Sequence, residues 1–136
     1  MARLSLSLLL VFGLLAASSE VSGSKEGLLP LNAFALESPG IGQSGPVKVS
    51  GAQSDGGISL LRIEAFGKNF TLQPHQLRGL NGFNANGVQI SYEGGYVDLG
   101  GRTIYVVFSR GFTSGRVMQR YVAVTETGAV SVGNVP

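Results

Sequence analysis

The stretch YEGGYVDLGGRTIYVVFSRGFTSGR, which runs from Tyr92 to Arg116, contains two Gly-Gly pairs separated by four residues. Paired glycines accept the positive φ angles that two-residue hairpin turns require, so we expect Gly94-Gly95 and Gly100-Gly101 to reverse the chain. Neither a G-x-G-x-x-G motif nor a Walker pattern with its lysine is present, so the glycines do not indicate a phosphate-binding loop. The stretch predicts three neighbouring antiparallel strands.

The two turns define an expected register for these strands. Tyr92 then faces Val97 across the first turn, and Val97 faces Ile104 across the second. Because alternate residues of a strand point to opposite faces of a sheet, one face is predicted to be apolar and the other polar. The apolar face comprises Val88, Ile90, Tyr92, Val97, Leu99, Ile104, Val106 and Phe108, and the polar face comprises Gln89, Ser91, Glu93, Tyr96, Asp98, Thr103, Tyr105, Val107 and Ser109.

Short β-branched and aromatic runs bounded by turn residues continue on both sides of this stretch. PVKVS and GISLLRIEAF precede it, and RVMQRYVAVTE and AVSVG follow it. Such a series is typical of an all-β fold, and we expect a small antiparallel β-sandwich or barrel that contains a C-terminal β-meander.

The register of residues 116–126 stays open at this point. A pairing of Phe108 with Met118 places Arg120 on the apolar face. A shift by one residue places Gln119 there instead, and a bulge near Arg120 would reconcile either pairing.

The N-terminus has the layout of a secretory signal peptide. Arg3 precedes an apolar run from Leu4 to Ala17, and small residues follow. This run is shorter than the roughly 20 residues that span a bilayer, so we expect no stable membrane insertion after signal cleavage. The expected parts are a signal peptide at 1–23, a flexible arm or linker at 24–45 and an antiparallel β-domain at 46–136.

The arm contains one apolar island, from Leu28 to Leu36, in a region rich in Ser, Gly and Pro. Pro30 could open a short helix there. The island is either a strap that packs on the domain or a segment that orders on contact with a partner.

Composition favours an exported, folded protein and excludes several classes of site. The chain has no cysteine, which removes disulfides, thiol nucleophiles and thiolate metal sites. Apolar residues make up 43% of the chain, which argues against disorder. The net charge of +2 is too small and too dispersed for nucleic-acid binding. We expect a secreted or periplasmic protein.

The segment SRGFTSGR is the first candidate binding site. Arg110 and Arg116 flank it, and Phe112 lies near its tip between glycines. An exposed aromatic residue with two arginines is typical of an interface anchor. The alternative is that Phe112 folds back and caps the end of the barrel.

Surface tyrosines form the second candidate site. By the expected register, Tyr96 and Tyr105 are cross-strand neighbours on the polar face, beside Asp98. Two aromatic rings among hydrogen-bonding groups suit a sugar ring or a protein partner. The alternative is that the tyrosines reflect strand propensity alone.

Catalysis, a cofactor and a metal are not expected. His75 is the only histidine, and no carboxylate lies within ten residues of it to orient it. Glu93 and Asp98 share the predicted polar face, but an open sheet face does not raise a carboxyl pKa as acid catalysis requires. Asn69 begins an N-F-T glycosylation sequon, a weak signal.

Together these features predict a non-catalytic β-domain that binds another macromolecule, as an inhibitor, adhesin or accessory subunit. A protein partner is favoured and a glycan is the second choice. A carbohydrate-binding module that uses the surface tyrosines is the alternative, and a small hydrolase built on Asp98, Glu93 or His75 comes last.

Overall fold

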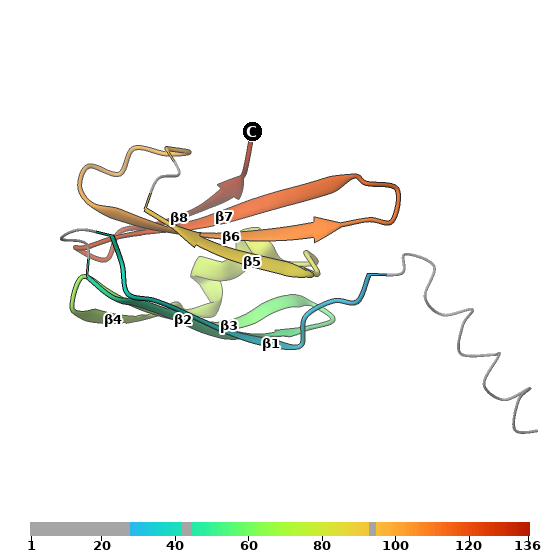
Figure 1. The fold of residues 1–136 in the computed structure, drawn as a ribbon, viewed down its shortest axis with the longest axis horizontal. Coiled ribbons are helices and arrows are strands. Elements are labelled where there is room, and N and C mark those ends of the chain that lie inside the picture. The colour runs from blue at the N-terminus through green and yellow to red at the C-terminus, as the bar shows by residue number, and fades with distance from the viewer. Residues whose placement is uncertain (1–27, 42–44, 93–94) are drawn as a thin grey trace, which may run out of the picture.

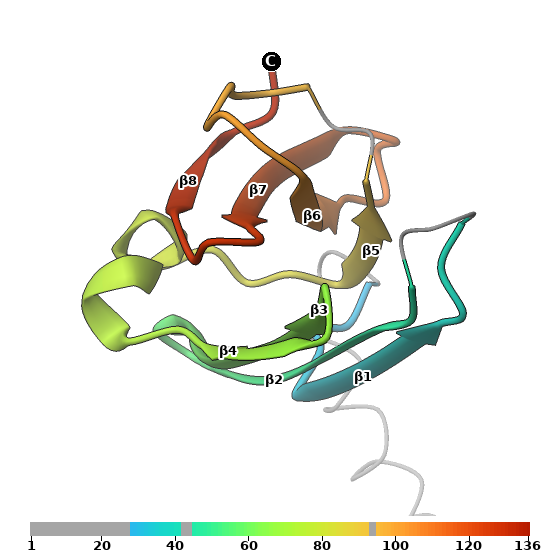
Figure 2. The ribbon, with the colours of Figure 1, turned by 90° about the vertical axis from the view of Figure 1, so that its left-hand side faces the viewer.

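The computed structural model describes residues 28–41, 45–92 and 95–136. The expected signal peptide and the first residues of the arm lie outside these residues, as do Glu93 and Gly94. Two four-stranded antiparallel sheets face each other as a sandwich (Figure 1 and Figure 2). The expected all-β fold is therefore confirmed, and it is a sandwich.

Each sheet is a meander in which every strand pairs with the next one in the chain. The C-terminal meander was expected, whereas the N-terminal sheet repeats the same topology. The first sheet consists of β1 (Ala33–Ser38), β2 (Val47–Ser54), β3 (Gly57–Ala65) and β4 (Lys68–Thr71), and the second of β5 (Gly87–Ser91), β6 (Thr103–Gly111), β7 (Val117–Thr125) and β8 (Val130–Asn134).

The core lies between the two sheets and follows the alternation of the strands. Every second residue of β2 and β3 points inward, and the side chains between them are exposed. The second sheet contributes inward-facing residues of β6 and β7. The main core residues of the strands are Val47, Val49, Leu61, Ile63, Ile104, Val106, Phe108, Val122 and Val124.

A 3-10 helix, η2 (Pro74–Leu80), and the irregular residues 81–86 connect the two sheets. Leu77, Leu80 and Phe83 from this connection are buried in the same core. Because η2 lies against β8, a Cβ on Gly79 would approach a Val132 methyl to 2.6 Å, so the close contact requires glycine.

Gln53 holds together two chain segments at one end of the sandwich. Its side chain is 6% exposed. Nε2 donates to the carbonyls of Leu31 at 2.6 Å and Ala85 at 3.0 Å, and Oε1 accepts from the Ala85 N–H at 2.7 Å. The buried amide therefore ties the residues before β1 and before β5 to β2, a link that no sequence motif indicated.

The predicted register around the glycine pairs is wrong. β5 pairs directly with β6, with Ile90 opposite Val106, and the described residues between Tyr92 and Thr103 form no strand. Gly100 and Gly101 do adopt the expected positive φ angles, of 71° and 135°. They turn the chain within a loop rather than within a hairpin.

The loop of residues 95–102 covers the outer face of the second sheet. Val97 and Leu99, expected on the core face, pack instead against Tyr105 and Tyr121 in a separate apolar cluster. The physical reason is that β6 and β7 are apolar on both faces, so their outer face also requires a cover. Val88, Ile90, Tyr92, Ile104, Val106 and Phe108 do contact the core as predicted.

The region expected to be a flexible arm contains a strand. β1 pairs with β2 along its whole length, from Ala33 opposite Ala52 to Ser38 opposite Val47. Phe34 packs against the core and meets the Phe108 ring edge-on, with the centroids 5.6 Å apart. This part of the apolar island therefore packs on the domain as an edge strand.

Candidate functional site

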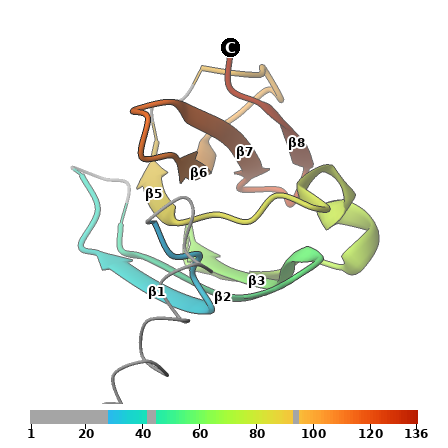
Figure 3. The ribbon, with the colours of Figure 1, turned by 90° about the vertical axis from the view of Figure 1, so that its right-hand side faces the viewer.

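The β6–β7 hairpin projects beyond the first sheet, at the end that faces the viewer in Figure 3. Its strands pair as far as Gly111 opposite Val117. The turn is then closed by two hydrogen bonds, from the Phe112 N–H to the Arg116 carbonyl at 2.8 Å and from the Gly115 N–H to the Phe112 carbonyl at 2.9 Å. The paired strands and the hydrogen-bonded turn therefore fix the backbone of the candidate residues where the hairpin projects.

Two guanidinium groups lie close to the Phe112 ring. The Arg110 Cζ is 5.3 Å from the ring centroid and the Arg116 Cζ is 5.5 Å away. Both distances are in the range of cation–π contacts. Phe112 is half-buried and is not part of either apolar cluster, so it does not cap the core. The structure brings the three residues that we singled out from the sequence into direct contact.

Strand β7 adds two residues that the sequence analysis did not select. Neither of the two pairings expected from the sequence occurs, and the strands pair without a bulge: Phe108 lies opposite Arg120, and Arg110 opposite Met118. Arg120 therefore points to the core-facing side. Its guanidinium covers the Phe83 ring at 4.9 Å and donates to the Gly79 carbonyl at 2.7 Å.

Arg116, Met118 and Arg120 form what we call the inner row. Met118 and Arg120 are alternate residues of β7, so they share a face. Arg116 Nη2 approaches the Met118 sulfur to 3.8 Å, which places Arg116 on the same side. The alternation of Arg, Met and Arg at positions 116, 118 and 120 was the sequence signal for this row.

The edge of β6 that faces away from β7 is hydrogen-bonded to the residues before β5. The Asn86 amide donates to the Gly111 carbonyl and accepts from the Gly111 N–H, both at 2.9 Å, as a neighbouring strand would do. Arg110 Nη1 donates to the Asn84 carbonyl at 2.8 Å. Asn84 Oδ1 is buried without a hydrogen-bond partner among the described residues.

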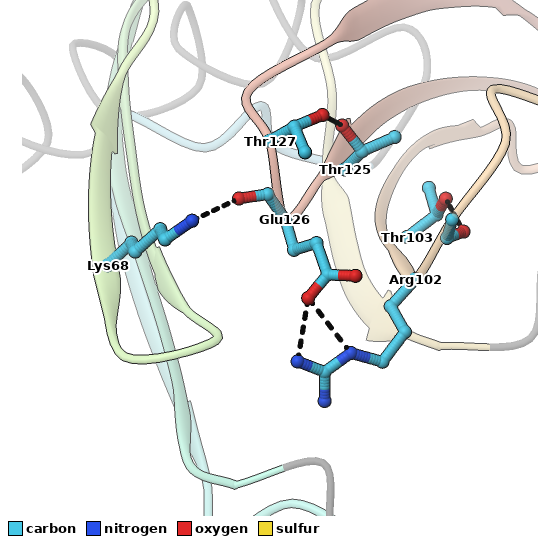
Figure 4. Close-up of polar contacts among 7 residues, drawn as sticks. Lys68, Arg102, Thr103, Thr125, Glu126 and Thr127 are labelled. Atoms are coloured by element: carbon cyan, nitrogen blue, oxygen red, sulfur yellow. Dashed lines mark hydrogen bonds and ion pairs between the residues drawn. The ribbon is translucent and has the colours of Figure 1, made fainter.

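The far end of the sandwich carries a different group of charges, shown in Figure 4. Arg102 donates to Glu126 Oε2 through Nη2 at 2.8 Å and through Nε at 3.2 Å. Lys68 Nζ donates to the Glu126 carbonyl at 2.8 Å. We call Lys68, Arg102 and Glu126 the clasp, because they join the β3–β4 turn to the β7–β8 turn and to the end of the loop 95–102.

The ion pair of the clasp shifts the pKa values of Arg102 and Glu126. The hydrogen bond from Arg102 is the main cause that holds the Glu126 pKa below its ordinary value of 4.5, and the same bond raises the Arg102 pKa. Burial raises the pKa of the nearby Tyr92, although the Arg102 charge opposes this effect. The Arg102 charge is therefore matched within the fold.

Phe66 supports the clasp from a strained backbone position. Its φ is 57°, a left-handed value that is rare for a bulky side chain, in the turn between β3 and β4. The Arg102 Cζ lies 5.1 Å from the Phe66 ring centroid, and Tyr92 meets the ring edge-on at 5.8 Å. Phe66, from a turn of the first sheet, thus contacts Arg102 and Tyr92, which lie next to the strands of the second sheet.

The tyrosine site differs from its prediction. Tyr96 and Tyr105 are in contact, with ring centroids 5.4 Å apart, and Tyr121 stacks on Tyr96 at 5.2 Å. However, Tyr105 is 4% exposed, and its hydroxyl donates to the Val97 carbonyl at 3.0 Å. The rings mainly hold the loop 95–102 on the sheet. Asp98 lies in this loop, where it caps the Gly100 N–H at 3.0 Å.

Two hollows of the surface complete the candidates. A shallow one of about 420 Å³ is lined in part by Asp98, Arg102 and Tyr105. Another, of about 530 Å³, lies over the outer face of the first sheet, with Lys48, Glu64 and the sequon residue Asn69 along it. Charges of both signs occur in the larger hollow, so it indicates no ligand of a particular charge.

A catalytic or metal centre does not emerge from the described part of the chain. Those residues contain no cluster of three or more potential metal ligands, and none of their helices is long and apolar enough to cross a bilayer. His75 lies at the exposed start of η2, whereas Asp98 lies in the loop 95–102.

Comparison with known proteins gives no further indication of function. No protein-family model matches the chain, and no curated protein or solved structure is significantly similar to it. Any functional assignment therefore depends on the geometry described above.

Proposed function

We propose that this protein is an exported, non-catalytic β-domain that binds another macromolecule, with a protein as the preferred partner, through its β6–β7 hairpin. The observation that carries the proposal is the contact of the Phe112 ring with both Arg110 and Arg116 on a projecting hairpin. Aromatic and arginine side chains dominate binding hot spots. A ring fixed in this way also loses little conformational freedom on binding.

The surroundings of the hairpin support an interface. Val117 is 58% exposed and Met118 is 38% exposed, and Leu28 approaches the hairpin at Gly111. Exposed apolar side chains next to arginines and an aromatic ring match the composition of interface cores. A glycan-binding function has less support, because Tyr105 lies beneath the loop 95–102 rather than on an open platform.

The test is affinity capture from the medium or periplasm of the native source, followed by mass spectrometry. The bait is the tagged protein, and the test variant is Phe112→Ala/Arg116→Ala. The matched control is Leu60→Ala/Arg62→Ala, which removes one exposed apolar residue and one arginine from the outer face of the first sheet.

We expect wild type and control to capture the same partner and the hairpin variant to lose it. The loss corresponds to a fall in affinity of about 30-fold or more. The melting temperature of the hairpin variant should stay within about 2 °C of wild type, because both replaced residues lie outside the core. Equal capture by all three proteins would refute a role for the hairpin.

A further inference from the structure

The inner row has a spacing that an extended peptide can match. Successive residues on one face of a strand are about 6.6 Å apart, so Arg116 and Arg120 stand about 13 Å apart on either side of Met118. An extended partner has the same rise per residue. Two carboxylates separated by three residues, with an apolar residue in the middle, would therefore meet both arginines and the methionine.

The two arginines of this row remain able to bind a carboxylate. Among the described residues neither Arg116 nor Arg120 forms an ion pair, and the Arg120 hydrogen bond goes to a neutral carbonyl. A guanidinium carries five N–H donors, so one such bond leaves most of them available. Planar guanidinium groups bind carboxylates with two parallel hydrogen bonds.

The distribution of charge along the molecule also favours an acidic partner. The described side-chain carboxylates Glu37, Glu64, Asp98 and Glu126 lie in the half of the sandwich that contains the clasp. At the hairpin end the described residues include a single one, Asp55, in the β2–β3 turn. The partner would thus enter a region where positive charge prevails.

The kind of cation points to a protein rather than to a polyanion. The described lysines, Lys48 and Lys68, both lie in the half with the clasp, so the hairpin end uses arginine alone. Arginine and methionine are enriched in protein interfaces, where lysine is depleted. Surfaces that attract nucleic acids or anionic lipids commonly use both cations.

We infer that the partner presents an extended acidic segment to the inner row, with carboxylates at Arg116 and Arg120 and an apolar side chain at Met118. This inference rests on the proposed function and adds the chemistry of the partner. The matching motif is an acidic residue, any residue, an apolar residue, any residue and a second acidic residue.

A library of random 12-residue peptides displayed on phage and selected on the purified protein tests the inference. We expect enriched peptides to contain this motif. As synthetic peptides they should bind Arg116→Glu about 10-fold or more weakly than wild type, and Met118→Ala also more weakly. Binding should weaken from about 0.05 to about 0.5 M NaCl, because salt screens exposed charges. The control Arg62→Glu makes the same charge change on the first sheet and should not alter binding.

The outcomes separate this inference from the proposed function. Peptides that lose binding to Phe112→Ala/Arg116→Ala but lack an excess of Asp and Glu would overturn the inference and leave hairpin binding intact. Peptides that bind this variant as well as wild type would contradict both. The absence of any enriched peptide would overturn the inference, and binding of heparin or phosphatidylserine vesicles that Arg116→Glu abolishes would then assign the row to a sulfated glycan or a lipid surface.

Discussion

The two ends of the sandwich use arginine in opposite ways. At one end Arg102 forms a hydrogen-bonded ion pair with Glu126 and covers Phe66, so its charge is matched inside the fold. At the other end Arg120 bonds to a backbone carbonyl and Arg116 lies over Phe112, with no ion pair among the described residues. Arginine thus stabilises the fold at one end of the sandwich, whereas the arginines at the other end keep a positive charge that a partner can bind.

The largest expected effect on stability comes from the buried Gln53 hydrogen bonds at the hairpin end rather than from the charges there. Gln53→Ala would leave the buried N–H of Ala85 without its acceptor. We expect a loss of about 3 kcal/mol in the free energy of unfolding, since an unsatisfied buried polar group costs about 1–3 kcal/mol and the side-chain packing is lost as well. Urea unfolding measures this loss, and Ser54→Ala, at the exposed neighbouring position, is the control. A loss below about 1 kcal/mol would show that this end does not depend on the amide.

A smaller loss in the free energy of unfolding is expected at the inner row, and its two arginines should differ in their contribution to stability. Arg120→Met removes the bond to the Gly79 carbonyl and the contact with Phe83, at a cost of about 1–2 kcal/mol. Arg116→Met should change the free energy of unfolding by less than about 0.5 kcal/mol, because Arg116 is exposed. Chemical denaturation of both variants checks this difference. Equal losses of unfolding free energy in the two variants would mean that Arg116 also stabilises the fold.

The clasp should give the smallest effect, and one that depends on pH. The Glu126 pKa is lowered in the fold, so the clasp contributes stability above the unfolded pKa and loses it as pH falls through the folded pKa. Wild type should therefore exceed Glu126→Gln in melting temperature near pH 7 by a small margin, which shrinks below about pH 4.5. Thermal unfolding at a series of pH values measures the margin. A constant margin across the series would exclude the carboxylate as its source.

The sequence predicted those parts of the fold in which one face alone is buried. The run GISLLRIEAF correctly indicated β3, in which Leu61, Ile63 and Ala65 are buried and the residues between them are exposed. The prediction failed where β6 and β7 bury both faces, because alternation then cannot tell whether Val97 and Leu99 cover the inner or the outer side.

The candidate site was only partly accessible from the sequence. Arg110, Phe112 and Arg116 are close in the chain, so their proximity followed from a single turn. Arg120 required the register of β7, for which the sequence offered two pairings; the structure has neither, because Phe108 lies opposite Arg120. The Gln53 links join residues 22 and 32 positions apart, and no local pattern encodes such contacts.

The most direct test of the central claim compares the two ends in one experiment. The measurement is the rise in melting temperature that a saturating acidic peptide from the selection produces in wild type, Arg116→Glu and Arg102→Glu, because a ligand that binds only the folded state stabilises it. The account predicts that the rise is retained in Arg102→Glu, although that variant starts from a lower melting temperature, and is lost in Arg116→Glu. A rise of equal size in all three proteins, or one lost only in Arg102→Glu, would contradict it.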